Sequence, residues 1–89
     1  MLFANAYTSQ ALLAAPPQLT EPVVRRFRVE VELALAASDH LVVDLTHTDT
    51  LDGWALLALL ELRELHGRRL TLVAPDFLLK AFDRLSARA

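Results

Sequence analysis

A polar loop between residues 44 and 52 holds the side chains of this chain that could carry out chemistry. His47, Asp49 and Asp52 are metal-ligating residue types at short spacing, and Asp44, His47 and Asp52 could act as general acids or bases. No second histidine lies nearby in the sequence on a rigid element, and loose matches of this kind rarely bind metal. A paired nucleophile and base, or a glycine-rich cradle, is also missing. We therefore expect no metal ligand and no catalytic residue.

Two of these carboxylates have structural explanations. Asp52 directly precedes apolar residues at helical spacing, where an N-cap side chain accepts backbone N–H bonds at the positive end of the helix dipole. Asp44 interrupts an apolar, β-branched run over 41–45, where an unpaired charge would be costly. We expect Asp44 to end a strand and bind loop amides. We expect Asp52 to cap a helix, a role that can coexist with partner binding.

The composition excludes several classes of function. The 89 residues are 54% hydrophobic and 22% charged, which predicts one folded domain over 1–89. A formal net charge of -2 gives no basic field for nucleic acid. The absence of cysteine excludes disulfides and thiolate metal sites, and Gly53 and Gly67 are too few glycines for a phosphate-cradling loop. Without a signal sequence or an apolar spanning segment, we expect a cytoplasmic protein that needs no cofactor and is not embedded in a membrane.

Four segments have the pattern of strands. Residues 41–45 and 70–74 are short apolar runs typical of buried strands. Residues 10–15 form another candidate, which two prolines end because proline cannot donate to a strand ladder. Residues 2–7 roughly alternate in character and could form an edge strand.

Three segments have the pattern of helices, over 20–37, 52–66 and 76–88. Thr20 can cap the first of them, and Gly67 with two arginines is typical of the end of the second. The resulting order is (β)β-α-β-α-β-α. It predicts a small α/β fold with a mixed or parallel sheet of about four strands packed against helices, since right-handed crossovers make the later strands parallel neighbours.

The first helix is the ambiguous element. Residues 27–33 alternate in the way a half-buried strand does. The same stretch also puts apolar side chains on one helical face, namely Val24, Phe27, Val31, Ala34 and Leu35. The capped start, the Ala-rich end and the length favour a helix. Val29 and Leu33 would then form an apolar pair on its far side.

The middle of the chain matches a known pattern. Val42-Val43-Asp44-Leu45-Thr46 is followed, after a few residues, by Asp52 and a leucine-rich helix. This arrangement resembles the STAS domain of anti-sigma-factor antagonists, where an apolar strand ends in Asp-Leu-Ser or Asp-Leu-Thr and the helix starts with Asp-Ser-Ser-Gly-Leu or Asp-Ser-Ala-Gly-Leu. The resemblance covers residues 10–85, and it implies a STAS-like domain that binds a protein partner without catalysis.

The sequence departs from that family at the phosphorylation switch. The family's phosphorylated serine follows the Asp, and the resemblance places Gly53 at this position, Trp54 at the next and Ala55 at the helix glycine. Because glycine has no hydroxyl group, the switch cannot operate at Gly53. Three nearby hydroxyls could replace the lost acceptor, those of Thr46, Thr48 and Thr50. The chain also lacks the strand and helix that usually close the family's domain, so we expect an uncovered sheet edge.

Trp54 is the residue that points most directly to a partner. At about 100° per residue, the core stripe of the second helix is Ala55, Leu56, Leu59 and Leu62. Trp54 points the other way, together with Leu57, Ala58, Glu61 and Leu65. An apolar strip on an outer face is covered either by another part of the chain, such as the N-terminal segment, or by a partner.

The favoured interpretation is a non-catalytic signalling module that regulates transcription through protein–protein contacts. The predicted partner-binding residues are Asp52, Gly53, Trp54, Leu57 and Glu61. By resemblance, the partner is a kinase-type anti-sigma factor, a larger signalling complex, or a transporter ATPase of the kind that carries small STAS subunits. The alternative is a self-associating structural domain, for instance a homodimer. A small enzyme using Asp44, His47 and Asp52 is the third and weakest reading.

Overall fold

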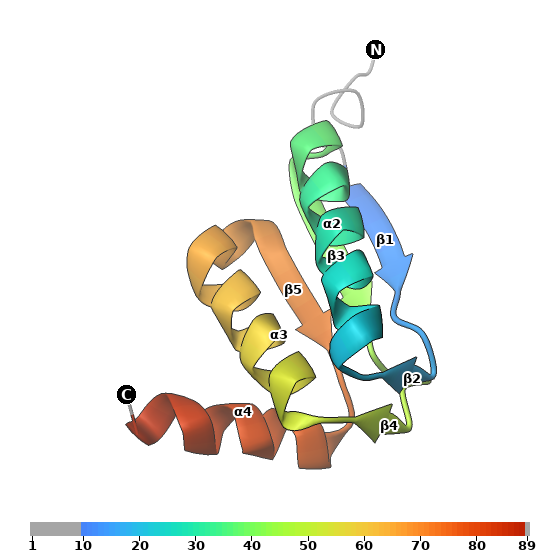
Figure 1. Cartoon of the computed structure of the whole chain (residues 1–89). Helices are drawn as coiled ribbons and strands as arrows, with labels where there is room; N and C mark the ends of the chain where they lie inside the picture. The colour runs from blue at the N-terminus through green and yellow to red at the C-terminus, as the bar shows by residue number, and fades with distance from the viewer. Residues whose placement is uncertain (1–9, 89) are drawn as a thin grey trace.

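The computed structural model describes residues 10–88, with side chains described as far as Arg84, so the predicted edge strand over 2–7 lies outside the described residues. Strands and helices alternate along the chain (Figure 1). The strands are β1 (Gln10–Ala14), β2 (Gln18–Leu19), β3 (His40–Asp44), β4 (Thr50–Leu51) and β5 (Leu70–Val73). The helices are α2 (Glu21–Ala37), α3 (Gly53–His66), a single 3₁₀ turn η1 (Gly67–Arg69) and α4 (Asp76–Arg88). All three predicted helices are confirmed, and α2 settles the ambiguity over residues 27–33.

The main sheet has three parallel strands in the order β1-β3-β5. Ala11 lies beside Leu41, and Leu41 lies beside Leu70. A separate pair, β2 with β4, joins the loops that follow β1 and β3. The predicted single sheet of about four strands is therefore replaced by three strands and this pair. Segments of two residues are too short to show a period of alternation, which is why the sequence did not reveal the pair.

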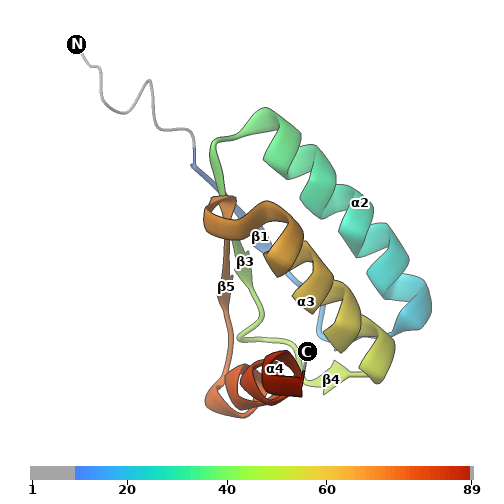
Figure 2. The same cartoon turned by 90° about the vertical axis from the view of Figure 1, so that its left-hand side faces the viewer.

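Helices α2 and α3 lie on the same face of the sheet, and α4 crosses near the carboxyl ends of the strands (Figure 2). The strand order explains this arrangement, because strands added in one direction through crossovers of one hand leave both crossover helices on one side. Burial along β3 consequently alternates, with Leu41 and Val43 buried and Val42 partly exposed. The predicted strands over 41–45 and 70–74 are confirmed as β3 and β5, but each is buried on one face only, because the described helices cover only one face of the sheet.

The core lies between this sheet face and the three helices. Helix α2 contributes four of the five side chains predicted for its inner face, Val24, Phe27, Val31 and Leu35, while Ala34 is partly buried. Its far-side pair stays exposed, Val29 by 57% and Leu33 by 66%. From α4, Leu78 and Phe82 are buried, and the guanidinium of Arg63 lies 5.4 Å from the centre of the Phe82 ring.

Helix α3 is more deeply enclosed than its predicted stripe implied. Ala55, Leu59 and Leu62 are buried as expected, but Ala58 and Leu60 are buried as well. The placing of Ala58 on an outer strip was wrong, because that side of α3 packs against α2. No helix among residues 10–88 is long and apolar enough to cross a membrane.

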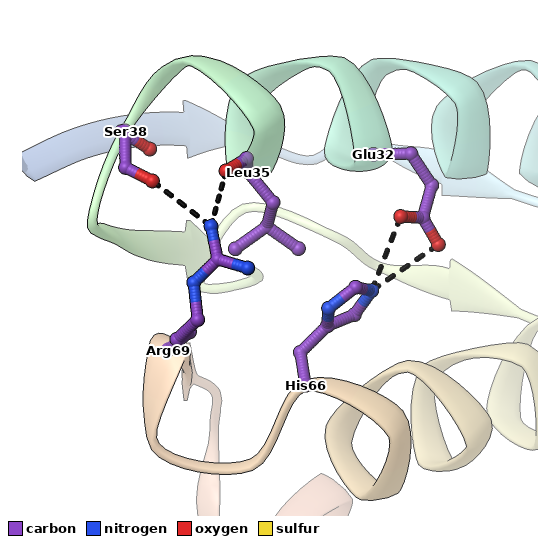
Figure 3. A network of polar contacts seen from close by, with 5 residues as sticks. All are labelled: Glu32, Leu35, Ser38, His66 and Arg69. Carbon is purple, nitrogen blue, oxygen red and sulfur yellow. Dashed lines mark hydrogen bonds and ion pairs between the residues drawn. The ribbon is translucent and has the colours of Figure 1, made fainter.

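The C-terminal end of α2 is held by side chains from the turn that follows α3 (Figure 3). Arg69 Nη2 donates to the carbonyl oxygens of Leu35 and Ser38, the latter at 3.0 Å. His66 Nε2 lies 3.2 Å from the carboxylate of Glu32. Gly67 ends α3 at a φ of 56°, a left-handed value that favours glycine, and its N–H donates to the Arg63 carbonyl as a helix C-cap does. The predicted basic turn is therefore confirmed and also anchors α2.

Candidate partner-binding site

The candidate site begins where β3 ends, at Asp44. Asp44 Oδ1 accepts hydrogen bonds from the Thr46 N–H at 2.9 Å and from the Thr46 hydroxyl at 2.6 Å. The expectation that Asp44 ends the strand and binds loop amides is confirmed. The Thr46 hydroxyl and then the Thr46 N–H lower the pKa of the Asp44 carboxyl, with a smaller contribution from His47. His47 Nδ1 lies 3.3 Å from the Thr46 hydroxyl, so Asp44 and His47 meet through one threonine.

Asp52 caps two helices at once. Its Oδ1 accepts from the N–H of Ala55 at 2.9 Å, which confirms it as the N-cap of α3. Its Oδ2 accepts from the N–H of Glu21 at 2.9 Å, in the first turn of α2. Thr20 occupies the N-cap position of α2 as predicted, but its side chain makes no capping bond. Because both helix N-termini carry partial positive charge, a carboxylate placed between them is favourable to each.

The threonines of the loop differ in how accessible their hydroxyls are. Thr48 is only 6% exposed, and its hydroxyl donates to the Pro16 carbonyl at 2.9 Å. Thr46 and Thr50 are exposed, and the Thr50 hydroxyl donates to Asp49 Oδ1 at 3.0 Å. Thr46 and Thr50 are therefore better placed than Thr48 to accept a phosphoryl group.

The remaining loop residues do not gather around a common point. Asp52 is directed at two helix N-termini, whereas Asp49 bonds its neighbour Thr50 and His47 contacts Thr46. Within residues 10–88, no three histidine, cysteine, aspartate or glutamate side chains come close enough together to hold a metal ion.

Trp54 and Leu57 are the exposed apolar residues at the start of α3, with 68% and 49% of their surface accessible. Trp54 and Leu57 both line two hollows on this surface. One, of about 430 Å³, is lined by Gly53, Trp54, Leu56 and Leu57. The other, of about 370 Å³, is a groove between α2 and α3 with the buried residues Val24 and Ala58 among those lining it. A partner side chain could therefore pack on either side of the indole ring.

The rim of the groove between α2 and α3 is charged. Arg25 pairs with Glu21 at 2.7 Å along α2, and Arg28 pairs with Glu61 at 3.1 Å across the two helices. These pairs are exposed and add little to stability in water. The groove therefore combines an apolar floor with a rim of both signs, as partner-binding surfaces commonly do.

The sequence predicted the α3 side of this site and missed the α2 side. Glu21, Val24, Arg25 and Arg28 line the groove from α2. Their spacing of three, one and three residues does place them on one helical stripe. Which neighbour that stripe faces depends on how α2 packs on the sheet, and the periodicity does not contain this information.

Comparisons of the chain with protein-family models, with curated proteins and with solved structures find no match. The function of the site is therefore inferred from its own geometry, and the STAS resemblance stays a prediction. Within the described residues, every buried side-chain nitrogen or oxygen has a hydrogen-bond partner. The surface available to a ligand therefore consists of exposed apolar side chains bordered by charged ones.

Because Asp52 caps two helices, its substitutions should destabilise the fold by different amounts. Asp52→Ala removes both acceptors and should lower the free energy of unfolding by about 2 kcal/mol, at about 1 kcal/mol for each cap. Asp52→Asn keeps one carbonyl oxygen and should lose about half as much. Asp49→Ala is the control, since it removes an exposed neighbouring carboxylate and should change stability by less than about 0.5 kcal/mol. Urea unfolding of the three variants measures this. If Asp52→Asn and Asp52→Ala lowered the free energy of unfolding equally, the two oxygens of Asp52 would not each cap a different helix.

The Asp44 carboxylate makes a pH prediction. Its folded pKa is lowered, so its contribution to stability is complete above its unfolded pKa and is lost as the pH falls through the folded pKa. Asp44→Asn keeps an acceptor oxygen for Thr46 but removes the charge. Wild type should be more stable than Asp44→Asn at neutral pH, and the difference should shrink in acid. Thr46→Val removes the principal donor and should raise the Asp44 pKa in an NMR titration of its side-chain carboxyl carbon. A stability difference that is the same at neutral and acidic pH would refute the assignment.

Proposed function

We propose that this domain is a non-catalytic, STAS-like interaction module that binds a protein partner through the start of α3. The observation that carries the proposal is Trp54, a large aromatic residue that is 68% exposed and lines two hollows. Aromatic side chains of this kind bury much area at little entropic cost, and they dominate the energetics of many interfaces. Together with Leu57, Trp54 forms an exposed apolar patch of the kind that marks interaction sites.

The order of the elements and the geometry of the loop support the STAS-like part of the proposal. Strand, loop and helix follow one another from His40 to His66 in the predicted order. Asp44 closes the strand and Asp52 opens the helix, the two acidic positions that the resemblance rests on. The partner-binding set is Asp52, Gly53, Trp54, Leu57 and Glu61, extended on the α2 side by Arg25 and Arg28.

The absence of a hydroxyl at Gly53 supports constitutive binding. Gly53 is exposed at the first residue of α3, beside Trp54, where the resemblance places the phosphorylated serine. A module without this acceptor would stay bound to its partner until the partner itself changed. By the same resemblance, the partner is a cytoplasmic anti-sigma factor of the kinase type, a signalling complex or a transporter ATPase.

Trp54→Ala tests the interface. Tagged domain would be used to capture its partner from a lysate of the source cells, and the purified partner would then be titrated with each variant. Trp54→Ala should weaken binding by about 2 kcal/mol or more, the usual threshold for a hot spot. Its thermal stability should change little, because an exposed side chain contributes little core packing.

Leu33→Ala is the matched control for this test. Leu33 is 66% exposed on the outer side of α2, so its removal also deletes exposed apolar surface while leaving the site intact. Its binding should equal that of wild type. A large drop in melting temperature for Trp54→Ala, with unchanged affinity, would show that Trp54 belongs to the core and would end the interface proposal.

Phosphorylation tests the lost switch. Incubation of the wild-type domain with the captured kinase-type partner and ATP should add no phosphate by intact-mass analysis. Gly53→Ser restores a hydroxyl without distorting the fold, since a Cβ atom at Gly53 meets no heavy atom within 4 Å. This variant should gain one phosphate at position 53 and bind the partner more weakly once phosphorylated. Phosphate on wild-type Thr46 or Thr50 would mean that the switch has moved to the loop.

A further inference from the structure

The sheet has a second face that no described element covers. Figure 2 shows α2 and α3 on one side of β1, β3 and β5, and no helix on the other side. Two rows of side chains cross this open face, Leu12–Val42–Thr71 and Ala14–Asp44–Val73. Leu12 is 71% exposed and Val73 is 42% exposed. Parallel sheets are normally buried on both faces, so this one lacks half of its usual covering.

The central strand carries a polar side chain at each end of the open face. His40 and Asp44 stand at opposite ends of β3, with Val42 midway between them on the same face. His40 Nε2 lies 2.8 Å from the Thr71 hydroxyl, and in the tautomer whose Nε2 accepts from this hydroxyl, Nδ1 carries the proton. Both bonds that Thr46 makes to Asp44 go to Oδ1, so Oδ2 has no donor from Thr46. In that tautomer, a donor at His40 and an acceptor at Asp44 lie about 13 Å apart, at about 3.3 Å per residue, on either side of an apolar centre.

We propose that a second copy of this chain docks on the open face, with its strands antiparallel to those of the first copy. A two-fold axis that passes between the sheets, perpendicular to the strands, places Val42 opposite the partner's Val42. The same axis places His40 opposite the partner's Asp44, and Asp44 opposite the partner's His40. Hydrogen-bond complementarity between the imidazole and the carboxylate selects this orientation.

The other two-fold arrangement is unfavourable. With the strands of the two copies parallel, Asp44 would face the partner's Asp44, and His40 would face the partner's His40. The lowered pKa of the Asp44 carboxyl keeps both carboxylates charged, so that arrangement brings like charges together in an interface.

The contact is a small one. Five residues of β1, five of β3 and four of β5 form the sheet, and only alternate side chains face outward. A standard interface uses about 20–30 residues from each partner, so we expect a dimer that dissociates on dilution through the micromolar range. The open face lies on the opposite side of the sheet from α3. Docking there leaves Trp54 accessible, and the inference is independent of the proposed function.

Cysteine cross-linking tests the contact directly, because the chain has no cysteine of its own. Val42→Cys, under mild oxidation or with a short thiol-reactive linker, should give a covalent dimer at concentrations where the wild type self-associates in sedimentation equilibrium. Leu33→Cys is the control, since Leu33 is more exposed to reagent than Val42 but lies on the outer side of α2. Val42→Lys should weaken association at least tenfold, because it puts two charges on the two-fold axis.

Mixed variants test the orientation. A mixture of His40→Cys and Asp44→Cys chains should cross-link between the two variants, whereas each variant alone should cross-link poorly. The reverse pattern would replace the antiparallel arrangement with the parallel one.

Three results would overturn the inference. One is a monomer throughout the concentration range, and another is a Val42→Cys dimer no more abundant than that of Leu33→Cys. The third is association that appears only after residues 1–9 are removed, because the N-terminal segment would then be the occupant of this face. Thermal melts of each variant show whether it is folded, and Val42→Cys keeps a side chain of similar size if Val42→Lys unfolds.

Discussion

The carboxylate of Asp52 joins the N-termini of the two helices that cover the sheet. One oxygen bonds the Ala55 N–H in α3 and the other bonds the Glu21 N–H in α2. Thr20 makes no capping bond of its own, so the start of α2 relies on a residue 31 positions away in the sequence. This single group fixes where the helices begin relative to each other. The groove between them, and the direction in which Trp54 leaves α3, follow from that spacing.

The opposite end of α2 is anchored by the same half of the chain. Arg69 donates to carbonyl oxygens of the last turn of α2 and of Ser38, and His66 contacts Glu32 one turn earlier (Figure 3). Helix α2 is thus capped at both ends by residues that lie around α3. Because helix ends expose unsatisfied backbone groups, these distant caps supply what the sequence around α2 does not. They also couple the formation of α2 to that of α3 and β5.

Local signals predicted the elements, and packing decided everything the sequence missed. The three helices could be predicted because their signals are local in the sequence: the apolar spacing, the N-cap Asp52 and the C-terminal Gly67. The hydrogen bonds by which Asp52 and Arg69 cap α2 could not be predicted, since each joins residues more than 30 positions apart. The place of Arg25 and Arg28 at the groove could not be predicted either, because it depends on how α2 packs beside α3. The one-sided sheet was foreseeable in principle, because consecutive strand order with crossovers of one hand already implies it.

The loop between β3 and α3 is held too firmly to act as a moving part. Asp44 holds Thr46 at its start, Thr48 bonds the Pro16 carbonyl in its middle, and Asp52 closes its end. The N–H groups of Asp49 and Thr50 both donate to the Pro17 carbonyl. A loop with this many anchors to a neighbouring segment has few alternative arrangements. It holds the open sheet face at Asp44 and the α3 surface at Trp54 in a fixed relation. Control of a partner at either surface would therefore have to act through added charge or through occupancy rather than through movement of this loop.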